Sequence, residues 1–228
     1  MAPESKRRYV RRLFATIADR YDFITRFLSF GRDRTWKRRL IDEAGLQSGW
    51  RVLDLACGTG DIAYEAASRG AGVVGLDITP RMIELARAKN RSQRVTWIVG
   101  DMSALPLRSS AFDMVTTGYG LRNVPELPRA LGEIHRALRP GGQLCSLDFD
   151  RPESAIVRAV YLSYLTIVGS ALGWVLHRDP DTYRYIPASI RRYPGARGVM
   201  ALMREAGFSD VRHLRVLGGL MAIHIARK

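Results

Sequence analysis

Short apolar runs alternate with amphipathic segments along the middle of the chain. The apolar runs predict buried strands at 51–56, 72–77, 95–99, 112–117 and 143–149. Between them, apolar residues at helical spacing predict helices at 61–69, 80–89 and 127–138, the last ended by Pro140-Gly141-Gly142. Strands separated by helices form a mostly parallel sheet with helices on both faces, so we expect an α/β fold.

The two ends of the chain have a different pattern. Apolar residues within 7–45 recur at spacings of one, three and four, which predicts one or two helices. The stretch 159–176 contains no charged residue, and its eighteen positions are the lower limit for a membrane span. Its hydroxyl side chains and flanking charges favour a half-buried or interfacial helix, with a plain core helix as the alternative. Two more strands are expected at 211–217 and 220–226.

The chain is strongly basic, and the charge is unevenly distributed. Its 228 residues include 36 Lys and Arg against 22 Asp and Glu, a net charge of +14. Residues 1–45 carry +6, 46–150 carry +1 and 151–228 carry +7. A hydrophobic content of 46% excludes a disordered polycation. The excess leaves three interpretations open: binding of nucleic acid, binding of anionic lipid headgroups, or solubility alone.

The cysteines and the N-terminus indicate the compartment. Cys57 and Cys145 are too few for a disulfide scaffold, and neither has a second Cys or His at ligand spacing. We therefore expect reduced thiols and no metal site. The N-terminus is basic but lacks the apolar stretch of a secretory signal, which favours a cytoplasmic location.

A glycine-rich loop, DLACGTGD at 54–61, follows the first expected strand. Its glycines let the backbone turn and let a ligand approach closely. Alone, the loop also fits the dinucleotide pattern G-x-G-x-x-A, so a nicotinamide enzyme is a rival. Asp77 ends the second strand, where it can accept ribose hydroxyls, and Asp101 follows the third, where it can face an adenine amino group. Asp54 and Asp61, at the two ends of the loop, would repel a pyrophosphate, so the acids together suit a cationic nucleoside without phosphate.

This arrangement resembles class I S-adenosylmethionine-dependent methyltransferases. The segment YGLRNV at 119–124 is similar to the Gly-Leu-Arg-Asn signature of the ubiquinone and menaquinone biosynthesis C-methyltransferases. Residues 8–228 resemble that family, and further segments follow in family order: FATIADRYD at 14–22, LSFG at 28–31, WK at 36–37, ALPL at 104–107, RPGG at 139–142, DTYRYIPASI at 181–190, AGF at 206–208 and GGLMAIH at 218–224.

The resemblance implies a Rossmann-like class I methyltransferase fold, with a seven-stranded, mostly parallel sheet. It also implies N-terminal helices and a helical insertion after strand five. We expect four regions: a basic helical region at 1–45, a cofactor-binding core at 46–150, a helical substrate- or membrane-facing insertion at 151–190, and a helix with a strand pair at 191–228.

The implied cofactor is S-adenosylmethionine, which leaves as S-adenosylhomocysteine, with no metal. The residues expected to hold it are Asp54, Gly58, Thr59, Gly60, Asp77, Ile78, Asp101 and Met102. Two positions depart from the family: Asp148 stands where a Glu is usual, and Gly118 where Ser is frequent.

The implied substrate is a reduced polyprenyl quinone precursor. Methylation of its ring carbon requires a ring hydroxyl to lose its proton, because the phenolate raises electron density on that carbon. Arg122 and Asn123 are expected to stabilise the oxyanion, with Arg122 orienting a water that accepts the proton and Asp148 as a third catalytic candidate. Secondary candidates for substrate contact are Tyr21, Tyr183, Tyr185 and His224.

The stretch 159–176 would wall the polyprenyl tail or rest on an anionic membrane. We therefore expect a protein at the inner face of the cytoplasmic membrane, and a homo-oligomer is compatible with the sequence. A methyltransferase acting on RNA or another small molecule is the main alternative, and a non-catalytic accessory protein is the second. The loop 118–120 has neither the Pro-Pro motif of base N-methylating enzymes nor a nucleophilic Cys, which disfavours RNA. These residues do not distinguish naphthoquinol from benzoquinol.

Overall fold

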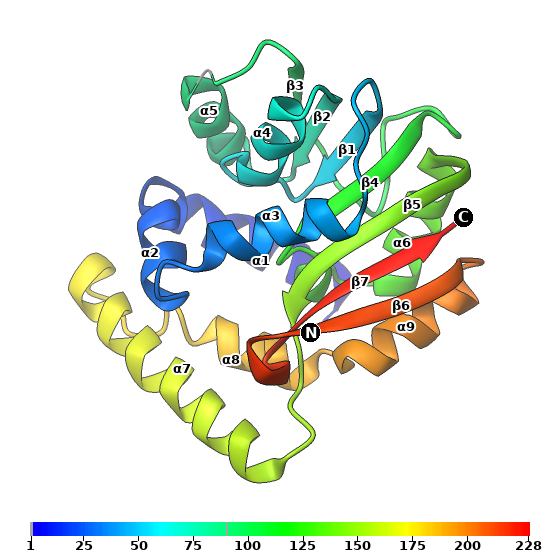
Figure 1. Ribbon diagram of the computed structural model, residues 1–228. Coiled ribbons are helices and arrows are strands. Elements are labelled where there is room, and N and C mark those ends of the chain that lie inside the picture. Colours follow the sequence, from blue (N-terminus) through cyan, green and yellow to red (C-terminus); the bar gives the residue numbers. More distant parts are fainter. Residues whose placement is uncertain (1, 90) are drawn as a thin grey trace.

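The computed structural model describes residues 2–89 and 91–228, and the strands in this part of the chain form one seven-stranded sheet. Its order is β3-β2-β1-β4-β5-β7-β6, with only β7 antiparallel to its neighbours (Figure 1), which confirms the predicted, mostly parallel sheet. The strands are β1 Arg51–Leu55, β2 Gly72–Asp77, β3 Val95–Val99, β4 Phe112–Gly118, β5 Leu138–Phe149, β6 Ser209–Val216 and β7 Met221–Arg227.

Helices cover both faces of the sheet because alternate strand residues point to opposite sides. Leu53 packs toward the helices Leu127–Ala137 and Gly195–Glu205, whereas its neighbour Val52 packs toward the helices Asp33–Glu43 and Asp61–Ser68. The helices are α1 Pro3–Ile17, α2 Tyr21–Leu28, α3 Asp33–Glu43, α4 Asp61–Ser68, α5 Pro80–Lys89, α6 Leu127–Ala137, α7 Ala155–His177, α8 Tyr185–Arg192 and α9 Gly195–Glu205. Short 3₁₀ segments lie at Ala18–Arg20, Leu121–Asn123 and Leu217–Gly219.

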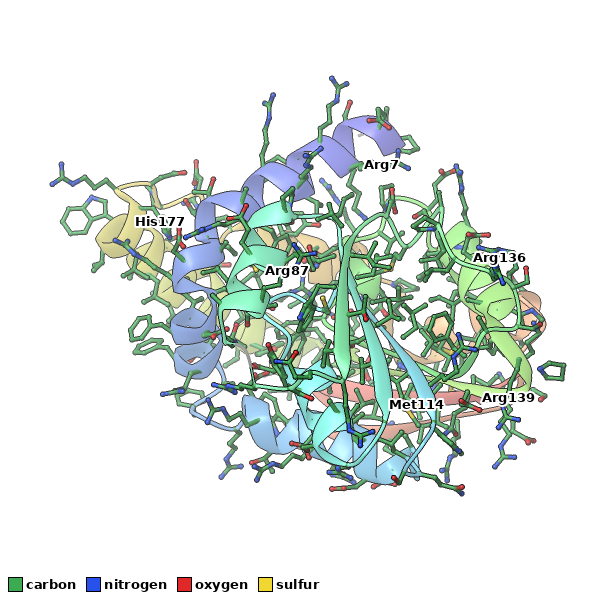
Figure 2. All side chains as sticks on the ribbon, turned by 90° about the horizontal axis from the view of Figure 1, so that it is seen from above. Arg7, Arg87, Met114, Arg136, Arg139 and His177 are labelled. Carbon is green, nitrogen blue, oxygen red and sulfur yellow. The ribbon has the colours of Figure 1, made fainter. Side chains whose placement is uncertain are left out.

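The N-terminal region differs from the expectation of one or two helices, since it contains α1, α2 and α3. Ala18–Arg20 forms a 3₁₀ turn between the first two. After α2 the backbone enters the left-handed region at Phe30 (φ 52°) and Gly31 (φ 76°), which no helix can continue through. Viewed from above (Figure 2), α1 lies along α5, and Asp19 after α1 pairs with Arg81 of α5 at 2.6 Å. Helix α1 thereby lies near the carboxyl ends of β2 and β3, where its Arg7 contacts Asp101.

The helix before Pro140-Gly141-Gly142 ends as expected, but these three residues lie within β5, which begins at Leu138 and not at the predicted 143. Helix α6 ends at Ala137, and Leu138 already pairs with Phe112 of β4. The register between β4 and β5 then shifts, because the next pair is Met114 with Gln143, so Pro140-Gly141-Gly142 lie in an irregularity of the sheet. A bulge accommodates a proline and glycines that a regular ladder would not.

Helix α7 contains the uncharged stretch and lies at one edge of the molecule (Figure 1). By length and composition α7 could cross a membrane, and only 22% of its apolar window is buried within this structure. A plain core helix would be mostly buried, so that alternative is wrong. Gly173 lets the helix approach the following segment, because a Cβ there would lie 2.4 Å from the carbonyl oxygen of Asp179.

Candidate functional site

Two adjoining hollows lie at the carboxyl ends of the strands. The first, here called the strand-end cleft, has a volume of about 700 Å³ and is lined by Asp77, Ile78, Asp101 and Met102 among others. The second, the apolar cavity, has a volume of about 1200 Å³ and is bounded by α2, α7 and α8 and by the segments next to them. Phe14, Tyr21 and Tyr119 line both, so these three aromatic residues form the boundary between them.

The two loop glycines have different roles. Gly58 (φ 53°) lines the strand-end cleft, and the nearest atom to a Cβ there would be in the Tyr21 ring, 3.7 Å away. Gly60 (φ 88°) precedes α4 and lines neither hollow. A Cβ on Gly60 would lie 2.4 Å from the Trp97 ring. Gly58 therefore gives access to the cleft, while Gly60 permits the turn and the packing of Trp97.

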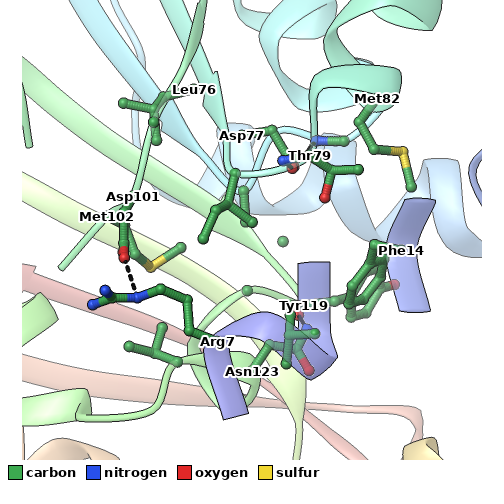
Figure 3. A pocket seen from close by; sticks show the side chains of 18 of the residues that line it. Arg7, Phe14, Leu76, Asp77, Thr79, Met82, Asp101, Met102, Tyr119 and Asn123 are labelled. Carbon is green, nitrogen blue, oxygen red and sulfur yellow. Dashed lines mark hydrogen bonds and ion pairs between the residues drawn. The ribbon is translucent and has the colours of Figure 1, made fainter. Parts of the chain in front are cut away.

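The acids that end β2 and follow β3 both face the cleft (Figure 3). Asp77 accepts hydrogen bonds from the backbone N–H of Gly58 at 2.9 Å and of Thr79 at 2.8 Å. Burial raises its pKa, and these two bonds oppose the rise. Asp101 forms an ion pair with Nε of Arg7 at 2.8 Å, shown as a dashed line in Figure 3. The N-terminal helix α1 is therefore held over the cleft by a charge contact.

Asp54 is completely buried and has one unpartnered oxygen. Its Oδ1 accepts a hydrogen bond from Oγ1 of Thr116 at 2.8 Å, whereas Oδ2 has no partner among the described residues. Burial raises the pKa of this carboxyl to about 7. A small pocket beside Asp54 is also lined by Gly58 and Thr59, so a cationic ligand group at the loop would find an acceptor there.

Thr59 is oriented by an acid that the sequence pattern did not single out. Its Oγ1 donates a hydrogen bond to Oδ1 of Asp22 at 2.5 Å, and Asp22 lies on α2. Lys89 is 2.8 Å from the other oxygen of Asp22. Asp22 falls within the segment 14–22 that resembles the family, so this segment was the available signal.

A buried lysine network beneath Tyr119 was also not predicted. Nζ of Lys37 lies 2.6 Å from Asp33 and 3.0 Å from Asp61. The hydroxyl of Tyr119 donates to Asp33 at 2.7 Å. Burial alone would lower the pKa of Lys37, but the two carboxylates outweigh it and raise that pKa. For Asp61, burial is outweighed by Lys37 and Lys89, which lower its pKa to about 2.

The three catalytic candidates are brought together at the boundary between the two hollows. Nε of Arg122 lies 3.2 Å from Oδ1 of Asp148, and Nη1 donates to Oδ1 of Asn123 at 3.0 Å and to Oγ of Ser189 at 3.2 Å. Arg122 lines the apolar cavity and Asn123 lines the strand-end cleft. Burial raises the pKa of Asp148, and Arg122 opposes the rise. The shorter side chain of Asp148 thus still reaches the arginine.

The secondary candidates separate into two groups. Tyr21, Tyr183 and Tyr185 line the apolar cavity, and the hydroxyl of Tyr183 lies 2.9 Å from Nε2 of His177. His224 lines neither hollow, because it packs between β5 and α9, with Nε2 donating to the carbonyl of Ala196 at 3.1 Å. Burial lowers its pKa to about 4. The expectation that His224 faces the substrate is therefore wrong.

Comparisons with known proteins agree with this geometry. The model of the ubiE/COQ5 methyltransferase family matches residues 2–228. A ubiquinone/menaquinone biosynthesis C-methyltransferase UbiE from Geobacter sp. (strain M21) is 37% identical over 226 residues, 96% of this chain and 96% of that relative. A demethylmenaquinone methyltransferase from Thermus thermophilus is 42% identical over 217 residues, 93% of this chain and 98% of that relative. A solved SAM-dependent methyltransferase from Thermotoga maritima, 22% identical, shares the fold with a TM-score of 0.67 over 95% of this chain and 99% of its own.

Proposed function

The chain belongs to the ubiE/COQ5 methyltransferase family, and from this premise we propose that it methylates a ring carbon of a reduced polyprenyl quinone precursor. The reaction would convert demethylmenaquinol to menaquinol, or carry out the equivalent benzoquinol step, or both. Family membership makes the protein an S-adenosylmethionine-dependent C-methyltransferase of quinone biosynthesis. The observation that supports the proposal best is an apolar cavity adjoining the strand-end cleft, with a buried arginine at their boundary.

The strand-end cleft fits S-adenosylmethionine, which when bound supplies a methyl group on a sulfonium centre. Each carboxylate oxygen of Asp77 has one hydrogen bond and can accept another, as ribose hydroxyls require. The unpartnered Oδ2 of Asp54 suits an ammonium group near Gly58. Ile78 and Met102 supply apolar contacts for a base. Asp101 is the candidate for the adenine amino group, so Arg7 would have to share that carboxylate or release it.

Arg122 is the candidate for stabilising the quinol oxyanion. Its Nε forms an ion pair with Asp148 but no hydrogen bond, and Nη1 donates to Asn123 and Ser189. Within residues 2–89 and 91–228, Nη2 has no hydrogen-bond partner. A fixed guanidinium with a free N–H at an apolar cavity can bind a developing phenolate without reorganising. It can also orient a water that takes the proton of the ring hydroxyl. Asp148 positions the guanidinium by its ion pair.

Arg122→Lys tests this role. Lysine keeps the charge but loses the planar fork that Asp148 and Asn123 orient. We expect turnover to fall about 10²–10³-fold, as for the loss of an oxyanion donor, while affinity for S-adenosylhomocysteine changes by less than about threefold. The exposed Arg191→Lys serves as the control. Turnover of Arg122→Lys equal to that of the control would refute the role.

The substrate class is tested separately by methyl transfer from labelled S-adenosylmethionine. The acceptors are reduced demethylmenaquinol analogues and demethoxy-type benzoquinol analogues, with RNA as the comparison. The proposal predicts label on one or both quinol types and none on RNA. Transfer to RNA alone would favour the nucleic-acid alternative, and no transfer to any acceptor would favour a non-catalytic protein.

The apolar cavity opens near an exposed apolar surface, which supports attachment to the inner face of the cytoplasmic membrane. Phe30 stacks against Tyr164 with ring centroids 6.0 Å apart, and both line the cavity. On α2, on α7 and in the turn after α2, the large apolar side chains that are 50% to 77% exposed are Phe23, Phe27, Phe30, Ile156, Val160, Ile167, Trp174 and Val175. A polyprenyl tail could pass from the bilayer into the cavity over this surface. The basic flanks would add attraction to anionic lipid.

Vesicle sedimentation tests the membrane contact. Burying a large apolar side chain contributes about 1.5–3 kcal/mol, so the double variant Ile167→Ser with Trp174→Ser should bind phosphatidylglycerol-containing vesicles at least about tenfold more weakly. Val99→Ser, an exposed apolar position on β3, is the matched control. Absence of vesicle binding by the unaltered protein would rule out the contact.

A further inference from the structure

A third hollow, here called the α1–α8 cavity, lies between the first helix and α8. Its volume is about 1180 Å³, and it shares Arg122 and Tyr185 with the apolar cavity. Four cations line it, and its only acid in the described lining is Asp181, which pairs with Arg184 at 2.7 Å. The proposed methyl transfer makes no use of this space.

Two of the lining cations lack a counter-ion. Lys6 from α1 and Arg192 from α8 form no ion pair within the described part of the chain, whereas Arg122 is paired with Asp148. Burial lowers the pKa of Lys6, and the nearby charges of Arg192 and Arg122 lower it further. Lys6 is half-buried and Arg192 is exposed, so the cavity carries positive charge that no acid pairs with, which favours binding of an anion.

Lys6 is already oriented toward this space by the backbone. Its Nζ donates hydrogen bonds to the carbonyl oxygens of Val124 at 2.6 Å and of Arg122 at 3.4 Å. An ammonium group has three N–H donors, so one remains for a ligand. The backbone contacts hold the ammonium group in place, so binding a ligand would cost little further side-chain conformational entropy of Lys6.

Two phenol groups supply further unused donors. The hydroxyls of Tyr185 and Tyr193 are buried and have no hydrogen-bond partner among the described residues. Both residues line the α1–α8 cavity, and Tyr193 is only 6% exposed. Buried hydroxyls are normally satisfied, so two unmet hydroxyls on residues that line the same cavity as the unpaired cations indicate a missing acceptor.

We propose that the α1–α8 cavity binds a phosphate group, held by Lys6, Arg192 and the hydroxyls of Tyr185 and Tyr193. A phosphate ester offers up to two negative charges and several acceptor oxygens, which match two unpaired cations and two hydroxyl donors. A carboxylate would leave part of this set unused. A bound phosphate would also join α1 to α8, and α1 is the helix that covers the strand-end cleft.

The test compares soluble and membrane sources of phosphate at constant ionic strength, so that screening does not change. The soluble probes are inorganic phosphate and sn-glycerol 3-phosphate, measured by the rise in Tm and by calorimetric Kd. The membrane probe is a phosphatidylcholine vesicle containing phosphatidylglycerol. Arg192→Gln removes one lining cation, and Tyr193→Phe removes one lining hydroxyl. The control is Arg191→Gln, which removes the same charge from an adjacent exposed position outside the lining.

We expect Arg192→Gln to weaken binding of the effective probe about tenfold, as for loss of a charge-assisted hydrogen bond. Tyr193→Phe should weaken it about threefold to tenfold, and Arg191→Gln should leave it unchanged. Such differences with the soluble probes assign a free phosphate, and differences only with vesicles assign a lipid headgroup. If Arg192→Gln and Tyr193→Phe behave like Arg191→Gln with every probe, the site does not exist. Affinity for S-adenosylhomocysteine, measured in parallel, reports the strand-end cleft separately.

Discussion

Protonation of Asp54 should control cofactor affinity near neutral pH. The carboxyl is buried, its Oδ2 has no partner, and its pKa is raised to about 7. A cationic ammonium group needs the ionised form as its acceptor. Binding must therefore drive the loss of any proton that Asp54 carries, and affinity must depend on pH.

The size of the effect follows from the pKa. If only the ionised form binds, a pKa of about 7 leaves about one molecule in eleven competent near pH 6 and nearly all of them near pH 8. Affinity should then rise about tenfold over this range.

The same carboxyl affects folding. The rise in the pKa of Asp54 from 3.8 unfolded to about 7 folded changes the unfolding free energy by about 4 kcal/mol between low and high pH. Because the folded pKa lies above the unfolded one, this contribution is fully present below pH 3.8 and is lost as pH rises through about 7.

Titration calorimetry with S-adenosylhomocysteine measures the dependence. Asp54→Asn cannot titrate but can still accept the hydrogen bond from Thr116, so its affinity should be weaker near pH 8 and nearly independent of pH. Asp42→Asn, an exposed acid, should behave like the unaltered protein. In chemical denaturation, the unfolding free energy of the unaltered protein should fall relative to that of Asp54→Asn as the pH rises over the same range. Equal pH slopes for the unaltered protein and Asp54→Asn would refute the reasoning.

Two further predictions concern stability. Gly60→Ala should lower the unfolding free energy by about 2–4 kcal/mol, because a Cβ would meet the Trp97 ring at a positive φ. Gly132→Ala, where a Cβ would have nothing within 4 Å, should raise the unfolding free energy slightly in the same denaturation experiment. An equal effect at both positions would contradict the packing argument. Lys37→Met should cost about 3–5 kcal/mol, because buried Asp33 would lose its counter-ion and Asp61 would keep only Lys89. The exposed Arg38→Met should change stability by less than about 0.5 kcal/mol, and a similarly small loss for Lys37→Met would show that the network is not stabilising.

The agreement between sequence and structure is closest where local pattern is sufficient. The strands at 72–77 and 95–99 have the predicted bounds, because each is a short run of mainly apolar residues. The expected burial holds for β2 but not for β3, which lies at the edge of the sheet and is partly exposed. The acids that follow these strands meet at one edge of the sheet, as parallel order requires. The helix predicted at 127–138 ends at Ala137, as expected before Pro140. The strand predicted at 143–149 begins earlier, at Leu138, because Leu138 pairs with Phe112 across an irregularity that the local pattern does not reveal.

His224 shows why a residue type alone does not place a side chain. Its position in a terminal strand was predicted, but which face it occupies depends on the register between β5 and β7 and on the packing of α9. A shift of one residue would have turned it to the other side. The exposure of α7 has the same origin, because an apolar helix is buried only if other elements cover it.

By itself, the sequence determined the α/β alternation, the glycine loop with its strand-end acids, and the family motifs around Arg122. These features depend on residues close together in the chain, where periodicity and spacing are readable. Only the tertiary structure decided that Arg7 reaches Asp101, that Lys37 joins Asp33 to Asp61, and that two cavities meet at Tyr21 and Tyr119. Apolar periodicity indicates which face of an element is buried, but strand order and helix packing determine what lies against that face.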